Sequence, residues 1–227
     1  MKYIIFGGTN EIIASVISLL PDSSDIILLG RSPEKFIDLF GKNSTIQFIE
    51  LDLSSIGSFN QFMNANERIF NKSTVIYSAS ITHIEFCDDV DSYDIINSVN
   101  VNYAVPYLLL SFLTKQSCQP EKFIYFSSIS AFVPRVKNIL YSTQKRSFDT
   151  TIDTLKSKIP FTVMSIRIGF VSTMYAKNHI PFAFLSISPK SAARMILKFM
   201  NKNKSGIFVA PFAWRLLSLP FVRYLLK

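Results

Sequence analysis

The chain alternates short runs of β-branched and aromatic residues with amphipathic stretches of helical length. The runs that predict strands are residues 3–6, 26–29, 46–49, 74–77, 123–126, 161–166 and 207–209. The stretches that predict helices are residues 12–20, 33–40, 58–70, 93–113, 142–155 and 190–200. Strands that alternate with helices form right-handed crossovers, which build a parallel sheet covered on both faces. We therefore expect an α/β, doubly wound, Rossmann-like fold.

The length of the chain predicts a single domain. Its 227 residues, 48% of them hydrophobic, can bury one sizeable core and leave little over for a second. We expect residues 1–227 to form one Rossmann-like domain that ends in an apolar and basic segment, residues 213–227. Cys87 and Cys118 stand in no disulfide or zinc-binding pattern, so we expect a cytoplasmic setting and no metal.

The formal net charge of +8 raises the question of a nucleic-acid partner. The basic residues are scattered, and the largest group suits a solvated helix end, so we expect no nucleic-acid binding. In residues 213–227, three cations fall opposite the apolar side chains on a helical wheel. Two interpretations stay open: this segment contacts an anionic membrane surface, or its apolar side covers the core or a partner subunit.

A glycine-containing turn follows the first predicted strand and leads into a helix. Gly7 and Gly8 open this turn, and the free amides of the helix could receive a pyrophosphate. Asn10 can adopt left-handed conformations and so could partly replace a missing glycine. Glu11 would repel a diphosphate if its carboxylate pointed the same way. The alternative is a strand, turn and helix that bind no nucleotide.

The second predicted strand ends without an acidic residue. Arg31 stands at its tip, where an Asp or Glu would hold the ribose of NAD, and an arginine can instead pair with the 2′-phosphate of NADP. This predicts NADP(H) as the cofactor. The alternative is that Arg31 is a surface residue before a helix that begins at Ser32 and Pro33.

Tyr141 and Lys145 stand four residues apart in a predicted helix, so their side chains point from the same face. A cation beside a tyrosine lowers the pKa of the phenol and makes it a proton donor or acceptor near neutrality. Ser128, at the end of a predicted strand, could hydrogen-bond an oxygen whose charge changes. These groups suit the interconversion of an alcohol and a ketone. The alternative for Ser128 is a serine that merely ends a strand.

In their order along the chain, these features resemble the short-chain dehydrogenase/reductase family over nearly the whole length. Asp52 and Leu53 resemble the family's pair that contacts adenine. Residues 77–80 occupy the place of its Asn-Asn-Ala-Gly segment and retain only the alanine, Ala79. Asn100 resembles the helix asparagine that supports a proton relay through water and lysine. Residues 167–173 resemble the segment that lies against the nicotinamide, with Ile168 in place of a proline.

The resemblance implies a role for each residue. Tyr141 would exchange a proton with the substrate, Lys145 would lower its pKa and hold the ribose, Ser128 would orient the substrate oxygen, and Asn100 would connect Lys145 to solvent. The residues implied to bind the cofactor are Gly7, Thr9, Asn10, Glu11, Ile12, Arg31, Ser32, Asp52, Leu53, Ser78, Ala79, Ser80, Tyr141, Lys145, Ile168, Gly169, Val171 and Thr173.

We therefore expect an NADP(H)-dependent oxidoreductase that reduces a ketone or aldehyde, or oxidises a secondary alcohol. Residues 172–188 should cover this small-molecule substrate. The family commonly pairs subunits through the helix that carries Tyr141 and the next helix, which implies a homodimer or homotetramer. Two alternatives stay open: a non-catalytic dinucleotide-sensing or scaffold protein of the same fold, and a compact keto-reductase or epimerase of sugars or lipid-linked sugars.

Overall fold

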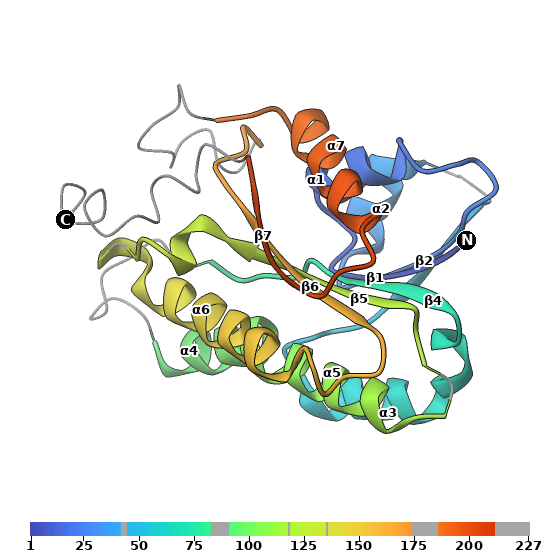
Figure 1. Cartoon of the computed structure of the whole chain (residues 1–227), viewed down its shortest axis with the longest axis horizontal. Helices are drawn as coiled ribbons and strands as arrows, with labels where there is room; N and C mark the ends of the chain where they lie inside the picture. The colour runs from blue at the N-terminus through green and yellow to red at the C-terminus, as the bar shows by residue number, and fades with distance from the viewer. Residues whose placement is uncertain (42–44, 83–90, 118, 135, 174–185, 212–227) are drawn as a thin grey trace.

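A computed structural model describes residues 1–41, 45–82, 91–117, 119–134, 136–173 and 186–211 (Figure 1). Within these ranges one seven-stranded sheet has the order β3-β2-β1-β4-β5-β6-β7. Every neighbouring pair of strands is parallel. The direction of winding reverses between β1 and β4, which is where such sheets bind their ligands. The expected doubly wound, Rossmann-like fold is confirmed.

All seven predicted strands are present. Their bounds are β1 Lys2–Phe6, β2 Asp25–Gly30, β3 Ile46–Glu50, β4 Ser73–Tyr77, β5 Lys122–Ser128, β6 Thr162–Ile168 and β7 Gly206–Ala210. The residues of β4 are all buried, as expected for a central strand covered on both faces.

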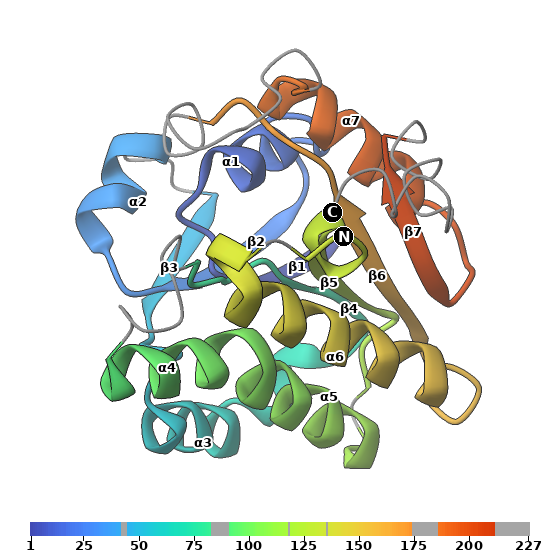
Figure 2. The same cartoon turned by 90° about the vertical axis from the view of Figure 1, so that its left-hand side faces the viewer.

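Seven α-helices cover the sheet in the described part of the chain. They are α1 (Glu11–Ile17), α2 (Pro33–Phe40), α3 (Ile56–Ala65), α4 (Ser92–Val99), α5 (Val105–Lys115), α6 (Ile139–Leu155) and α7 (Pro189–Met200). Figure 2 shows α1, α2 and α7 on one face and α3, α4, α5 and α6 on the other. Two separate cores result: Phe148 of α6 lies in one, and Ile196 of α7 lies in the other.

This arrangement separates the two helices expected at the subunit contact. The helix that carries Tyr141 is α6, and the next helix in the described chain is α7. These two helices lie on opposite faces of the sheet (Figure 1). Which helices meet a partner subunit stays a prediction.

Two predicted helices are interrupted. The stretch 58–70 becomes α3, which ends at Ala65, and a 3₁₀ turn over Glu67–Phe70. The stretch 93–113 becomes α4, one π-helical turn over Asn100–Ala104, and α5. Predicted helix 12–20 also ends early, at Ile17.

Pro106 explains the π-helical turn. A proline has no amide hydrogen, so the carbonyl of Asn102 loses its regular helical donor. The amide of Val105 donates to Asn100 instead, which leaves the carbonyl of Val101 without its own donor. Two buried tyrosines supply the missing donors: the Tyr77 hydroxyl donates to Val101 at 2.6 Å, and the Tyr125 hydroxyl donates to Asn102 at 2.9 Å.

Several sequence predictions concern residues outside the described ranges. These are the C-terminal segment 213–227 and most of the expected substrate cover, residues 174–185. Among the described residues, no helix is long and apolar enough to cross a membrane. The same residues contain no group of three or more His, Cys, Asp or Glu side chains that could hold a metal ion.

Candidate active site

Polar side chains from three elements meet where β4 and β5 end beside α6. Ser80 follows β4, Ser128 is the last residue of β5, and Tyr141 stands in the first turn of α6. Tyr141 hydrogen-bonds with the side chains of both serines. The structure thus brings together the serine and the tyrosine that spacing predicted, and it adds Ser80 as a second partner of the phenol.

Burial raises the pKa of the Tyr141 phenol above its ordinary value, although the hydrogen bonds from Ser128 and Ser80 lower it, and the charge of Asp149 raises it further. We expected a lowered pKa, caused by Lys145. The Lys145 amine lies 5.7 Å from the centre of the Tyr141 ring. It is itself desolvated, so it carries only part of a positive charge at neutral pH and does not outweigh the burial of the phenol.

Lys145 is on α6, and its side chain is 1% exposed and reaches the end of β5. Its Nζ donates to the carbonyl of Phe126 at 2.9 Å and lies 4.4 Å from the centre of the Tyr125 ring. Burial lowers the pKa of Lys145 to about 7, and the negative charge of Asp149 opposes this change. Lys145 can therefore gain or lose a proton near neutral pH.

A buried ion pair that the sequence analysis missed lies behind Lys145. Asp149 accepts hydrogen bonds from Ser165 and from the Nε of Arg167, both on β6. The Arg167 guanidinium lies 3.5 Å from the centre of the Phe132 ring, in the segment that joins Ser128 to Tyr141. Two signals were available: an acidic residue four positions after Lys145 on the same helix, and an arginine within an apolar strand.

The structure does not bring Asn100 to Lys145 by any hydrogen bond described. The Asn100 amide donates to the carbonyl of Ser54 at 2.8 Å. Asn102, two residues later, is fully buried and pairs with both backbone groups of Ile81: it donates to the carbonyl at 2.7 Å and accepts from the amide at 3.0 Å. Its amide also donates to Gln144 at 2.7 Å. Asn102, rather than Asn100, therefore holds the segment after Ser80 against α6.

The glycine turn is built around a close contact between two strand ends. Gly7 has φ of 81°, and a Cβ there would lie 2.3 Å from the backbone nitrogen of Ala79. A Cβ on Gly8 would lie 2.7 Å from the side chain of Leu28. Gly7 is thus required by the packing of the protein itself, whereas a side chain at Gly8 would require Leu28 to move.

Asn10 does not adopt the left-handed conformation that would replace a glycine. Its backbone is extended, with φ of −141°, and its side chain caps α1 by accepting from the amide of Ile13 at 2.9 Å. The same side chain donates to the carbonyl of Gly7 at 2.8 Å. Ser78 also donates to this carbonyl, at 2.9 Å, so side chains span the turn from both sides. Glu11 is the first residue of α1.

The remaining residues expected at the cofactor fall into two groups. The polar ones lie at the carboxyl edge of the sheet: Arg31 is exposed directly after β2, Ser32 caps α2, and Asp52 accepts from the amide and hydroxyl of Ser54. Others serve the fold. Leu53, Ile168 and Val171 are buried in the cores, Ile12 packs against one core, Gly169 donates to Ala210, the amide of Thr173 donates to Val171, and Thr9 lies beside Gly30.

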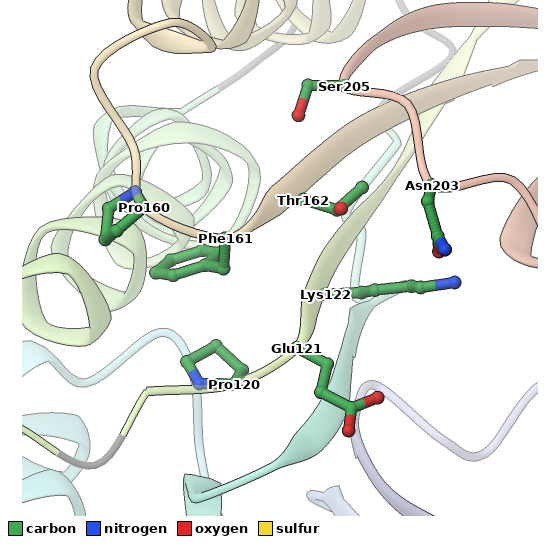
Figure 3. Close-up of a pocket in the computed structure, with 8 residues that line it drawn as sticks. All are labelled: Pro120, Glu121, Lys122, Pro160, Phe161, Thr162, Asn203 and Ser205. Atoms are coloured by element: carbon green, nitrogen blue, oxygen red, sulfur yellow. The ribbon is translucent and has the colours of Figure 1, made fainter.

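A cavity in the described part of the chain lies away from these groups. It has a volume of about 470 Å³ and opens at the amino-terminal edge of the sheet, where β5 and β6 begin (Figure 3). It is lined by Pro120, Glu121, Lys122, Pro160, Phe161, Thr162, Asn203 and Ser205. Ser128 ends β5 at the opposite edge, so this cavity is not part of the candidate active site.

Solved structures with the same fold include several oxidoreductases. A 4-hydroxyisoleucine dehydrogenase complexed with NADH has a TM-score of 0.79 at 17% identity, over 92% of this chain and 96% of that chain. An alcohol dehydrogenase from the archaeon Thermococcus sibiricus, complexed with 5-hydroxy-NADP, has a TM-score of 0.75 at 15% identity, over 92% and 94%. A short-chain type dehydrogenase/reductase from Mycobacterium ulcerans has a TM-score of 0.77 at 16% identity, over 95% and 90%.

No curated protein sequence matches the chain significantly. The family model of the KR domain matches residues 1–173, which run from the glycine turn through Ser128, Tyr141 and Lys145 to the segment after β6. Such a match over most of the chain supports an oxidoreductase. The chain belongs to the short-chain dehydrogenase/reductase family, within which it carries a KR domain.

Proposed function

We propose that the protein is an NADP(H)-dependent oxidoreductase that interconverts a small carbonyl compound and the corresponding alcohol. The observation that carries this proposal is the contact of the Tyr141 phenol with Ser128 and Ser80, one helical turn from the buried amine of Lys145. A phenol held by two hydroxyls beside an amine that titrates near neutrality is suited to proton exchange with a substrate oxygen.

The chemistry of the donor set fits a nicotinamide dinucleotide. Tyr141 and Lys145 offer donors to ribose hydroxyls, and the exposed guanidinium of Arg31 suits a 2′-phosphate. Gly7 and Gly8 keep the backbone of the turn free of side chains next to α1. Proteins of the same fold have been solved with NADH and with 5-hydroxy-NADP.

When bound, the reduced cofactor supplies hydride to the carbonyl carbon. The protein supplies the proton and the placement. Tyr141 is protonated at neutral pH because burial raises the pKa of its phenol, so it can donate to the carbonyl oxygen. Ser128 holds that oxygen by a hydrogen bond. Oxidation of an alcohol requires Tyr141 to accept a proton, so we expect reduction to be favoured at neutral pH and oxidation to gain as pH rises.

One observation favours the non-catalytic alternative. The Asn10 side chain accepts a hydrogen bond from the amide of Ile13 and donates one to the carbonyl of Gly7. Part of the backbone that faces the turn is therefore already hydrogen-bonded. If these bonds persist, the turn binds a pyrophosphate weakly, and the protein would be a sensor or scaffold of the same fold.

Calorimetric titration with NADPH and NADH distinguishes the two functions. We expect NADPH to bind and NADH to bind more weakly, and Arg31→Ala to weaken NADPH binding while leaving NADH binding unchanged. Binding of neither cofactor would favour the non-catalytic alternative. Equal loss of both in Arg31→Ala would contradict the assignment of Arg31 to the 2′-phosphate.

A screen of aliphatic and aromatic ketones with NADPH tests the chemistry. With any substrate found, Tyr141→Phe should retain NADPH binding and lose about 10²- to 10⁴-fold in kcat, as expected for loss of a general acid. Turnover of this variant at the parent rate would show that Tyr141 does not transfer the proton.

We also propose that the subunits pair through the face formed by α4, α5 and α6. Tyr93, Ile96 and Tyr107 are 71%, 59% and 43% exposed on α4 and α5, which is unusual for side chains of this size. Light scattering of the parent protein and of Ile96→Asp tests this. The parent should be a dimer or tetramer and the variant smaller; an unchanged mass would place the contact elsewhere.

A further inference from the structure

Three charged side chains are buried in the described part of the chain, and all three lie in one place. Lys145, Asp149 and Arg167 are 1%, 1% and 8% exposed. Lys145 and Asp149 lie one turn apart on α6, and Arg167 comes from β6 beneath that helix. Burying a charge costs free energy unless an opposite charge accompanies it, so these three groups have to be considered together.

Asp149 is held by two donors from the same strand. Ser165 donates to its Oδ1 at 2.5 Å, and the Nε of Arg167 donates to its Oδ2. Ser165 and Arg167 are two residues apart on β6, so both side chains leave the same face of the sheet. The Arg167 guanidinium also stacks on Phe132 at 3.5 Å, which fixes its plane. The carboxylate and the guanidinium therefore form a rigid pair with no net charge.

Lys145 faces a limited set of titratable groups. Tyr141 and Asp149 lie near it on α6 and Tyr125 on β5, with Tyr77 of β4 behind Tyr125 at 6.0 Å between ring centres. Arg167 of β6 is paired with Asp149. Among these described groups, Asp149 is the one whose charge acts on Lys145. Its charge raises the pKa of Lys145, against the lowering by burial that leaves the value at about 7.

We infer that Asp149 and Arg167 are positioning residues that set the charge of Lys145 in opposite senses. The carboxylate favours the ammonium form of Lys145, and the guanidinium, by neutralising that carboxylate, favours the free amine. The two together leave Lys145 able to take up and release a proton near neutral pH. The catalytic consequence, renewal of the Tyr141 proton, rests on the proposed function; the effect on Lys145 itself does not.

An NMR titration of the protein without cofactor tests the inference directly. Protein labelled with ε-¹³C-lysine gives one resonance per lysine, and the signal of Lys145 is identified by its loss in Lys145→Arg. The pH midpoint of this signal is then compared in the parent, Asp149→Asn and Arg167→Met. We expect the midpoint to fall by about one pH unit or more in Asp149→Asn and to rise by a similar amount in Arg167→Met.

The opposite signs separate charge from packing. A loosened core would admit water and raise the pKa of a buried lysine in both variants, because hydration restores the ordinary value. Asp149→Glu is the matched control, since it keeps the charge, and its midpoint should stay near that of the parent. A midpoint that is unchanged or raised in Asp149→Asn, or lowered in Arg167→Met, would overturn the inference.

Removing one member of a buried pair can prevent folding, so a double variant completes the design. Asp149→Asn combined with Arg167→Met removes both charges and should give a midpoint between those of the two single variants. If Asp149→Asn does not fold, the pH midpoint of Lys145 is compared between Arg167→Met and the double variant, which differ only in the charge of residue 149. A midpoint in Arg167→Met that is not higher than that in the double variant would refute the role of Asp149.

Turnover measured on the same proteins separates this inference from the proposed function. The apparent pKa that Lys145 gives to the pH profile of kcat should shift in each variant in the same direction as the NMR midpoint. Shifted midpoints without NADPH-dependent turnover in any protein would uphold the inference and refute the proposed function. NADPH-dependent turnover in the parent, together with unshifted midpoints in the variants, would support the proposed function and refute the inference.

Discussion

The burial of Lys145 makes stability depend on pH in a definite direction. Its pKa is about 7 in the folded protein and about 10.4 in an unfolded chain. Between these values the unfolded chain binds one more proton than the folded protein does. The free energy of unfolding therefore rises with pH across this window, by up to about 1.4 kcal/mol per pH unit.

Urea unfolding between pH 7 and 9.5 measures this dependence, with Lys145→Met as the control because it keeps the bulk and cannot titrate. The parent should gain stability relative to Lys145→Met as pH rises. Parallel curves for the two proteins would show that Lys145 titrates near its ordinary pKa. The range stops below pH 10 because Tyr141, whose pKa is raised, binds more protons in the folded state there and acts with the opposite sign.

Asn100 and Asn102, two residues apart, should contribute differently to the free energy of unfolding. Asn102→Ala should leave the partly buried amide and carbonyl of Ile81 without these partners and destabilise the protein by about 2–4 kcal/mol. Asn100→Ala removes one partly buried hydrogen bond to Ser54 and should cost about 1 kcal/mol. Urea unfolding of both variants gives the comparison, and equal costs would contradict the roles assigned here.

At the scale of the residue, spacing alone located part of the candidate site. Tyr141 and Lys145 share a face of an α-helix, and Ser128 was expected to end a strand, so their meeting could be predicted. The difference between Asn100 and Asn102 could not, because the π-helical turn changes which residue faces α6. The pKa direction of Tyr141 also depends on burial, which the sequence does not show.

At the scale of the element, Pro106 and two tyrosines form one unit. Tyr77→Phe should leave the buried carbonyl of Val101 unpaired and cost about 1–3 kcal/mol. In a Pro106→Ala background this cost should shrink, because residue 106 then has an amide that can serve the freed carbonyls. Equal costs in both backgrounds would show that Pro106 does not cause the π-helical turn.

The measurement is a double-variant cycle of unfolding free energies. Tyr3→Phe serves as the matched control, since the Tyr3 hydroxyl donates only to the sulfur of Met1 at 3.4 Å, and its removal should cost nearly nothing. Helix periodicity could not reveal this unit. The apolar pattern of residues 93–113 continues through the π-helical turn. The donors to the freed carbonyls of Val101 and Asn102 are Tyr77 and Tyr125, which lie on other elements, β4 and β5.

At the scale of the whole molecule, the order of strands and helices was enough to predict the fold. Alternation of strand and helix forces parallel crossovers, and each crossover can cover only one face of the sheet. From β1 to β6, the strand order and right-handed crossovers account for the face on which each helix lies. The helix α7 is the exception: β7 continues in the direction from β5 to β6, yet α7 lies on the face opposite α6, so this connection departs from the right-handed rule and its face could not be predicted.

The single-domain prediction can be tested through the two cores. Phe148 packs only in the core under α6, and Ile196 only in the core under α7, with the sheet between them. Every strand contributes alternate residues to both faces, so loss of either core should release the same sheet. Phe148→Ala and Ile196→Ala should therefore lower one common transition, by about 3–5 and about 2–5 kcal/mol respectively. Fluorescence and circular dichroism, followed together through urea unfolding, should give coincident curves for the parent and both variants. Two separated transitions, each moved by only one of the variants, would mean that the two faces unfold independently and that the chain is not one cooperative domain.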